Sequence, residues 1–407
     1  MTDTTNNIVL VAPRQRWWAV GLAVISLLVL SAVTVAVIIP AQTFARADNP
    51  FRDEVEPAPF ARIPASTESV NDRVVYNDLP DDVDVYETDG DFFFVTVSAP
   101  DQSVLSWLIG QTEEVVDPLT PEGKFGNLTP TQNRQISLQQ MRTATQEAQY
   151  VALLAAGYEP TIERGEVVVE EVLCLVPSIG SPDCEERFPA DEQLDPADTI
   201  LEVAGVPVST LDELSAELDG LAPGDTVDLK IRRPEVGELD VTVELSASPD
   251  EPDRTLIGFR PFDTATVALP FDVSIDSGAI GGPSAGLAFT LALIDELTVG
   301  ELTGGRNVAV TGTIDLEGNV GPIGGLKQKV SAVKQHGVEV FLIPASQFEL
   351  GDPAPDEEPG SVCRWECLNE VAGGDVVLVP VANLGEALEA LRLLGGDPLV
   401  PVGQEPA

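Results

Sequence analysis

The chain has 407 residues, with 67 aspartates and glutamates against 22 lysines and arginines, and a formal net charge of −45. A surface this acidic repels phosphate groups and excludes nucleic acid as a partner. The length allows two or three domains with a sizeable core. The sequence contains no G-x-x-x-x-G-K-[ST] phosphate loop, so ATP binding of that kind is excluded and no cofactor is expected.

The first element is an apolar segment at residues 17–39, which carries no charged residue and is long enough to span a bilayer. Two tryptophans at its start and two arginines in the tail 1–16 predict a transmembrane helix with its N-terminus in the cytoplasm. The rest of the chain is then extracytoplasmic, on a single-pass anchor in the cell membrane. A cleaved signal peptide is the alternative, because residues 45–47 read Ala-Arg-Ala, although the apolar region is longer than is usual for a signal.

Residues 40–66 are rich in proline, alanine and acid and are interpreted as a linker. Residues 67–158 have an α/β pattern, with strands expected at 74–76, 83–87 and 92–97 and a turn at 88–91 between the last two. A long helix is expected at 131–156, ended by Gly157. The acidic run at 78–91 lacks the spacing of a calcium loop, so no metal site is expected.

Residues 159–250 form a separate β-rich pattern, with strands expected at 167–175 and 226–232 and a helix at 210–218. This pattern resembles the bacterial PDZ domain, which implies a peptide groove beside the helix that carries Leu211, Leu214 and Leu218. A peptide would bind there by adding a strand to the sheet edge. A carboxylate-binding loop of the Gly-Leu-Gly-Phe type is not evident, so capture of free C-termini is not expected. The alternative is a spacer that only packs on the rest of the protein.

A glycine-rich turn, Gly281-Gly282-Pro283-Ser284-Ala285-Gly286, leads into an apolar helix expected at 287–297. A serine in this position is held exposed beside the free N–H groups of the first helical turn, which can bind an oxyanion. Gly281 and Gly282 are the turn and oxyanion positions of this arrangement. A serine hydroxyl is a weak nucleophile, so the turn also needs a general base.

The base is expected on a second helix, which follows Gly324-Gly325. Leu326, Val330 and Val333 define its buried face; Lys329 sits at the edge of that face, whereas Lys327 projects from the polar side. Burial disfavours the ammonium form, and lowering a lysine pKa from about 10.4 to around 7–8 requires roughly 4 kcal/mol. Lys329 is therefore the expected base. The single histidine, His336, is interpreted as a residue of the helix C-terminus.

Three motifs occur in a fixed order, namely the Gly-Pro-Ser-Ala-Gly turn, the Thr-Gly-Thr-Ile segment at 311–314 and the Gly-Gly-Leu-Lys-Gln-Lys segment at 324–329. Together they resemble the proteolytic domain of Lon-type serine peptidases. The resemblance implies a Ser-Lys dyad with Ser284 as nucleophile, Lys329 as base and Thr311 as the residue that helps to hold the lysine. Cytoplasmic Lon enzymes carry an aspartate three residues before the serine, where this chain has Gly281.

The closer likeness is to the membrane-anchored branch of the family, which pairs the Lon-type domain with a PDZ domain. It implies protein or peptide substrates, hydrolysis without ATP and a homo-oligomer, by family resemblance a hexameric ring. The expected fold is α+β. The PDZ-like domain is expected as an insertion in a protease domain that continues through residues 251–398, and residues 399–407 are expected to be a disordered tail.

The four cysteines fall into two local pairs, Cys174 with Cys184 and Cys363 with Cys367. Outside the membrane this spacing predicts two disulfides, and zinc is the less expected alternative because the chain has one histidine. The predicted function is that of a membrane-anchored serine endopeptidase. The alternative is a peptide-binding scaffold built on an inactive protease fold.

Overall fold

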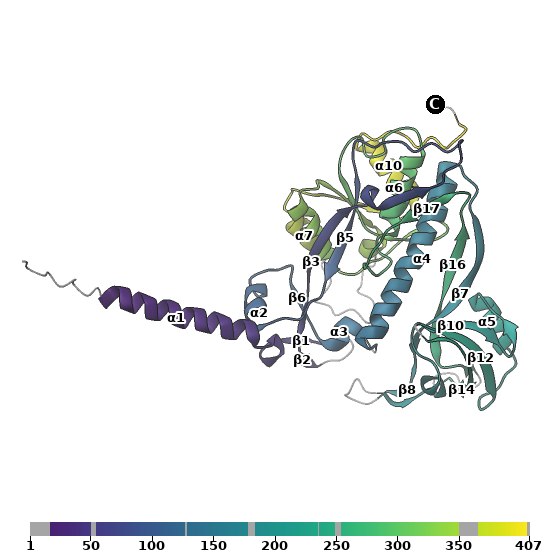
Figure 1. Cartoon of the computed structure of the whole chain (residues 1–407), viewed down its shortest axis with the longest axis horizontal. Helices are drawn as coiled ribbons and strands as arrows, with labels where there is room; N and C mark the ends of the chain where they lie inside the picture. Colours follow the sequence, from purple (N-terminus) through teal and green to yellow (C-terminus); the bar gives the residue numbers. More distant parts are fainter. Residues whose placement is uncertain are drawn as a thin grey trace, which may run out of the picture.

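The computed structural model describes residues 17–49, 54–126, 128–177, 184–234, 236–248, 254–349 and 365–404. The expected α+β fold is confirmed: two sheets of six strands each, with separate cores, carry helices and are preceded by one long apolar helix (Figure 1).

The first sheet has the strand order β22-β21-β18-β5-β3-β6. Its strands are β3 (Phe60–Ser69), β5 (Phe92–Ser98), β6 (Asp117–Leu119), β18 (Val308–Val310), β21 (Val340–Pro344) and β22 (Val377–Val381). Strands β5, β18, β21 and β22 run parallel, whereas β3 is antiparallel to both β5 and β6. Two segments that lie far apart in the sequence therefore build one sheet.

Alternating side chains of this sheet enter two different cores, because successive residues of a strand point to opposite faces. Phe92 and Phe94 of β5 join the core around α6, whereas Phe93 and Val95 join the core around α7. The first face is covered by α4 (Pro130–Ala156), α6 (Gly286–Leu297) and α10 (Leu384–Leu393), and the second by α7 (Leu326–His336) and α9 (Trp365–Ala372). The sheet thus separates α6 from α7.

The second sheet is antiparallel, with the order β13-β12-β10-β7-β16 and β11 beside β10. Its elements are β7 (Thr161–Val172), β10 (Thr199–Val203), β11 (Val206–Pro207), α5 (Leu211–Leu218), β12 (Thr226–Arg233), β13 (Gly237–Glu244) and β16 (Phe259–Ala268). It encloses a core of its own. Strands β7 and β16 pair along most of their length and form the ribbon that joins this domain to the first sheet (Figure 1).

Short elements complete the described chain. They are η1 (Ala41–Thr43), β1 (Arg46–Asp48), β2 (Val55–Pro57), η2 (Asn71–Arg73), β4 (Val74–Asn77), α2 (Val104–Gly110), α3 (Pro121–Phe125), β8 (Cys174–Pro177), β9 (Cys184–Arg187), η3 (Pro189–Glu192), β14 (Ser246–Ala247), β15 (Thr255–Leu256), β17 (Asp272–Ile275), β19 (Thr313–Ile314), β20 (Val320–Gly321) and α8 (Ser346–Glu349).

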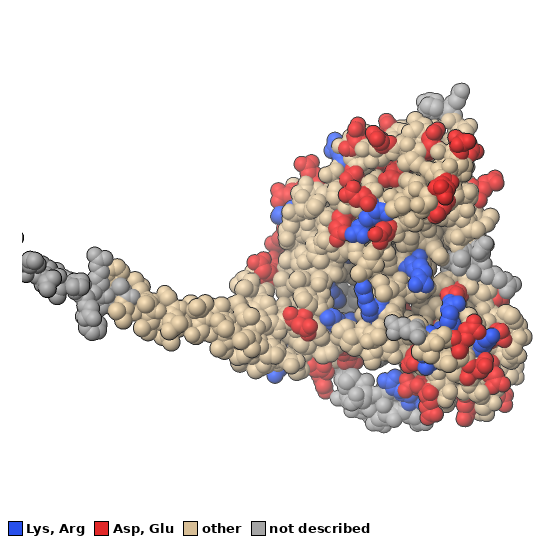
Figure 2. All heavy atoms as spheres, in the orientation of Figure 1, with Lys and Arg blue, Asp and Glu red and all other residues tan. Residues whose placement is uncertain are grey.

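Helix α1 (Trp17–Ile38) projects from the body as an isolated rod that bears no acidic or basic side chain among its described residues (Figures 1 and 2). Its segment Val20–Ile38 has a mean hydropathy of 2.7 and none of it is buried in the protein. By length and composition this helix can cross a membrane, although a signal sequence would share both properties.

The sequence expectations for three segments outside the second domain are wrong. Residues 40–66 are not a linker, because β3 begins at Phe60 and lies between β5 and β6. Residues 83–87 form no strand, and the Tyr86 N–H instead donates to the Glu296 carbonyl at 2.8 Å. Part of the expected disordered tail packs on the body, because the Val402 N–H donates to the Ala156 carbonyl at the end of α4. Each of these features depends on contacts with distant segments.

The strongest local signals are confirmed. Helix α4 begins after Thr129, whose side chain forms a capping box with Gln132, and ends at Gly157 with φ +95°. The expected boundary at residue 250 is too early, since β16 continues the second sheet to Ala268. The division into a protease domain with an inserted PDZ-like domain stays a prediction, which this strand order supports.

Candidate active site

Ser284 occupies the glycine-rich turn immediately before α6, and its backbone is fixed by the segment that follows β18. The Ser284 carbonyl accepts hydrogen bonds from the Gly312 N–H at 3.0 Å and from the Thr311 hydroxyl at 3.1 Å. The Thr-Gly-Thr-Ile motif therefore holds the serine turn. The Ser284 hydroxyl is left to face the lysine of the other helix.

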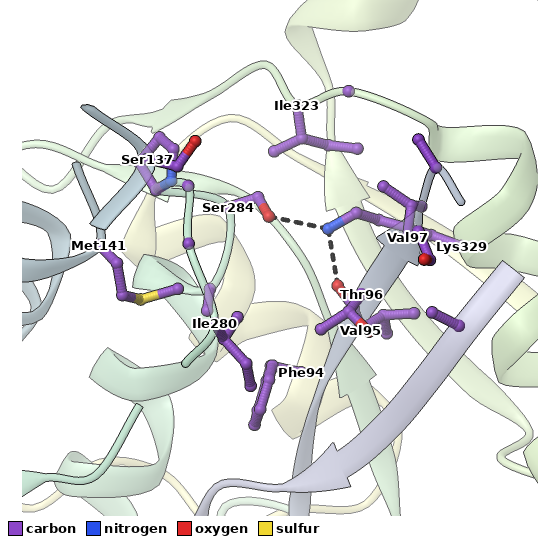
Figure 3. Close-up of a pocket in the computed structure, with 18 of the residues that line it drawn as sticks. Phe94, Val95, Thr96, Val97, Ser137, Met141, Ile280, Ser284, Ile323 and Lys329 are labelled. Carbon is purple, nitrogen blue, oxygen red and sulfur yellow. Dashed lines mark hydrogen bonds between the residues drawn. The ribbon is translucent and has the colours of Figure 1, made fainter. Parts of the chain in front are cut away.

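Lys329 belongs to α7, which covers the face of the sheet opposite to α6. Its amine reaches Ser284 just beyond the end of β18, where β5 continues without a paired neighbour on that side among the described strands. Its Nζ lies 2.8 Å from Ser284 Oγ and 2.7 Å from the Val95 carbonyl oxygen (Figure 3). It also lies 3.0 Å from Thr311 Oγ1. A neutral amine has two N–H donors and one lone pair. It can donate to Val95 and Thr311 while its lone pair accepts the hydroxyl proton of Ser284.

The Lys329 side chain is deeply buried, with a residue exposure of 2%. Loss of hydration disfavours the ammonium form and lowers the pKa of Lys329 to about 7. Among the described residues no carboxylate forms an ion pair with this amine, which would have raised the pKa again. The neutral amine is therefore accessible near pH 7.

The glycines of the turn have a different arrangement from the one expected. Gly282 adopts φ +87°, which favours glycine, but its N–H donates to the Ser137 carbonyl of α4 at 2.7 Å and is not free for an oxyanion. Gly281 packs against Ser137, where a Cβ would lie 2.7 Å from the Ser137 Cβ. By contrast, the N–H groups of Ser284 and Ala285 donate to no acceptor among the described residues.

A cleft of about 1460 Å³ opens beside Ser284. Figure 3 shows Ile280, Met141 and Phe94 grouped on one side of the serine. The backbone of β5 from Val95 to Ser98 forms another wall, beyond the end of its pairing with β18. The cleft thus offers an apolar recess and an open strand edge next to the hydroxyl.

Other residues singled out in the sequence lie elsewhere. His336 is exposed at the end of α7, where its ring contacts that of Phe93 at 5.3 Å, and it does not line the cleft. Lys327 is not an ordinary surface residue, since its Nζ lies 2.5 Å from Asp117 Oδ1 and its side chain is 17% exposed. Asp117 also accepts from Gln328 at 2.6 Å, so this carboxylate anchors β6 to α7.

Of the three leucines assigned to a peptide groove, Leu214 is buried in the core of the second domain. Leu211 and Leu218 pack partly against that core. Peptide binding beside α5 stays a prediction.

Cys367 is disulfide-bonded. Its predicted partner, Cys363, lies outside the described residues, as do the side chains of Cys174 and Cys184. Both predicted disulfide pairings therefore stay predictions. Among the described residues no group of histidines, cysteines and carboxylates could hold a metal ion.

Two participants in the site had no signal in the sequence. The Val95 carbonyl is a backbone group, and Ser137 lies about two turns beyond the start of an otherwise ordinary helix. Only the tertiary structure brings either of them to the serine turn.

Comparison with protein families matches residues 266–357 to the Lon protease (S16) C-terminal proteolytic domain. The Lon protease of Roseiflexus castenholzii is 34% identical over 131 residues, which are 30% of this chain and 16% of that protein. The Lon protease of Chloroflexus aggregans is 35% identical over 162 residues, or 37% of this chain and 18% of that protein. The chain thus spans less than a fifth of the length of these curated relatives.

A solved PDZ domain of an SdrC-like protein from Listeria monocytogenes covers 25% of this chain and 92% of its own, at 19% identity and a TM-score of 0.20. A score this low carries no argument about fold or function. The family match is more informative, because the matched residues 266–357 include Ser284, Thr311 and Lys329. Residues 266–357 of this chain are therefore similar to the Lon protease (S16) C-terminal proteolytic domain.

Proposed function

We propose that the chain is a serine endopeptidase that cleaves protein or peptide substrates with a Ser284–Lys329 dyad and without ATP. The observation that carries this proposal is the 2.8 Å contact between Ser284 Oγ and the buried amine of Lys329. A hydroxyl within hydrogen-bond reach of a group with a pKa of about 7 has the base that it needs.

In the proposed reaction, neutral Lys329 takes the hydroxyl proton while Ser284 Oγ attacks the carbonyl carbon of the scissile bond. The resulting ammonium gives that proton to the departing amine nitrogen, which leaves an acyl-enzyme. Water then attacks the ester, Lys329 accepts a proton from the water, and the serine is released with that proton. The lysine is neutral at the beginning and at the end of the cycle.

The oxyanion of each tetrahedral intermediate needs donors close to Ser284 Oγ. We assign this role to the N–H groups of Ser284 and Ala285, which have no other acceptor among the described residues. The Gly282 N–H could join them only after its hydrogen bond to Ser137 is broken. The proposed donors thus differ from the glycines expected from the sequence.

The substrate side chain next to the scissile bond is proposed to occupy the recess of Ile280, Met141 and Phe94, which favours an apolar residue. The substrate backbone is proposed to lie along the open edge of β5, whose peptide groups would pair with it. Peptide binding by the second domain and assembly into a ring remain proposals drawn from resemblance.

Helix α1 is proposed to anchor the protein in a membrane, with the catalytic domain outside the cytoplasm. An apolar surface at the base of α1 supports an interfacial position of the body. Phe44, Leu108 and Ile109 there are 58%, 50% and 57% exposed. The Val104 N–H of α2 donates to the Ile39 carbonyl at 2.9 Å, so this surface is tied to the end of α1.

The experiment that tests the proposed function is hydrolysis of an unfolded protein by the detergent-solubilised chain, compared with its Ser284→Ala variant. We expect cleavage by the native chain and none by the variant. A non-catalytic scaffold predicts no difference between the two, and it also predicts that a serine-reactive phosphonate leaves Ser284 unlabelled.

A further inference from the structure

The walls of the cleft differ in charge from the rest of the protein. Lys124 at the end of α3 and Arg134 in α4 both line it, and Glu366 is the one carboxylate among its described lining residues. The chain as a whole has 67 acidic residues against 22 basic ones. Figure 2 shows lysine and arginine side chains gathered around the central hollow, whereas acidic side chains are spread over the outer surface.

Arg134 is not neutralised by the start of its own helix. It is the fifth residue of α4, just beyond the first turn to which the effect of the helix dipole is largely confined. The first turn of α4 contains no acidic residue, whereas the first turns of α5 and α10 both do. Among the described residues no carboxylate forms an ion pair with Arg134.

Lys124 also has no ion-pair partner among the described residues. Its ammonium lies 3.9 Å from the ring centroid of Phe60 and 4.8 Å from that of Phe125, and no described carboxylate pairs with it. Partial burial lowers the pKa of Lys124, and the negative charge of Asp101 acts in the opposite direction. The two aromatic rings orient the ammonium without cancelling its charge.

Both cations line the cleft in which the substrate is proposed to bind. Arg134 precedes Ser137 by three residues, or about 4.5 Å along the helix axis. The Ser137 carbonyl in turn accepts from Gly282 of the serine turn at 2.7 Å. An extended peptide advances about 3.3 Å per residue, so a side chain a few residues from the scissile bond can meet Arg134.

We propose that Lys124 and Arg134 form a subsite for acidic side chains, so that the protease selects segments with aspartate or glutamate a few residues from an apolar cleavage position. This inference rests on the proposed function. An exposed or half-exposed charge pair contributes about 0.2–1 kcal/mol, so each cation is expected to change affinity by up to about 5-fold.

The test uses fluorescent peptides that share one leucine and otherwise contain glutamine, with a single glutamate moved through successive positions. Binding is measured by anisotropy on the Ser284→Ala chain. We expect glutamate at one or two positions to tighten binding about 3- to 10-fold over glutamine, and we expect salt to reduce this preference. Arg134→Gln and Lys124→Gln should each lower it, and Arg134→Glu, which sets a negative charge beside Lys124, should abolish it.

Arg142→Gln is the matched control, since Arg142 is an exposed arginine of α4 that does not line the cleft. The proposal is overturned if glutamate and glutamine peptides bind equally at every position. It is also overturned if the preference survives in the Lys124→Gln, Arg134→Gln double variant. Because binding is measured without turnover, failure of the subsite is distinguishable from failure of the proposed function, which would appear as absent hydrolysis of all peptides by the native chain.

Discussion

Gly281 of the serine turn lies against Ser137 of α4 so closely that a Cβ would come within 2.7 Å of the Ser137 Cβ and 3.1 Å of its carbonyl carbon. The neighbouring Gly282 N–H is bonded to the same residue. Helix α4 is therefore the surface on which the serine turn rests, and the position of Ser284 depends on it.

Gly281→Ala should displace the turn from α4 and move Ser284 Oγ away from Lys329. We expect kcat/KM to fall by about 10- to 100-fold, because displacements of about 1 Å have effects of that size. Adding Ser137→Gly removes the closest clash and should restore part of the activity. Equal activity of the native chain and Gly281→Ala in a peptide assay would contradict this role of the contact.

Thr311 links both members of the dyad, because its hydroxyl accepts from Lys329 Nζ at 3.0 Å and donates to the Ser284 carbonyl at 3.1 Å. Thr311→Val keeps the shape and removes both bonds, so we expect about a 10-fold loss in kcat with a smaller change in KM. Thr311→Ser should retain most of the activity. If Thr311→Ser is as impaired as Thr311→Val, packing of the methyl group matters rather than the hydroxyl.

Burial of Lys329 should reduce stability. Its pKa of about 7 in the folded protein is lower than the unfolded value of about 10.4, so the unfolded chain binds more protons between these two values. Stability therefore rises with pH across that window, by about 1.4 kcal/mol per unit, and the deficit is full and constant below pH 7.

Lys329→Met removes this deficit and should raise the free energy of unfolding by up to about 4 kcal/mol below pH 7, less about 1 kcal/mol for lost hydrogen bonds. The gain should vanish above about pH 10. Denaturant titrations of both proteins across this range measure it. A gain that does not depend on pH would indicate a change in packing rather than removal of a buried charge.

The apolar surface at the base of α1 should lie at the lipid boundary. A fluorescent label can be attached to Phe44→Cys, Ile109→Cys or Val377→Cys in vesicles whose lipids carry spin-label quenchers. Val377 is the comparison, because it lies on β22 and is 55% exposed. We expect lipid-borne quenchers to reach the first two labels and not the third. Equal quenching at all three positions would argue against contact between this apolar surface and the membrane.

The sequence predicts the parts of the site that local chemistry determines. The glycine-rich turn and the apolar period of α7 are local patterns, and the latter already assigns Lys329 rather than Lys327 to the buried edge. The periodicity of α7 does not reveal the bond from Lys327 to Asp117, because that carboxylate belongs to a distant strand. Nor does any local pattern show that the Ser137 carbonyl accepts the Gly282 N–H.

The fold shows the same division. Helix α4 was predictable because its capping residues and its terminal glycine stand at both ends of one segment. Strand β3 was not, since its proline and alanine content resembles that of a linker and only pairing with β5 and β6 makes it a strand. Strand β18 spans three residues, too few for a periodic signal, although the site forms where it ends.

The protonation state of Lys329 tests the central claim most directly. The chain contains five lysines, so carbon-13 labelling of their side chains gives a spectrum in which Lys329→Arg identifies one signal. We predict that this signal titrates near pH 7, and that the rate of Ser284 labelling by a phosphonate probe rises with pH over the same range. A Lys329 amine that stays charged to pH 10, with labelling that follows no titration near neutrality, would contradict the proposed dyad.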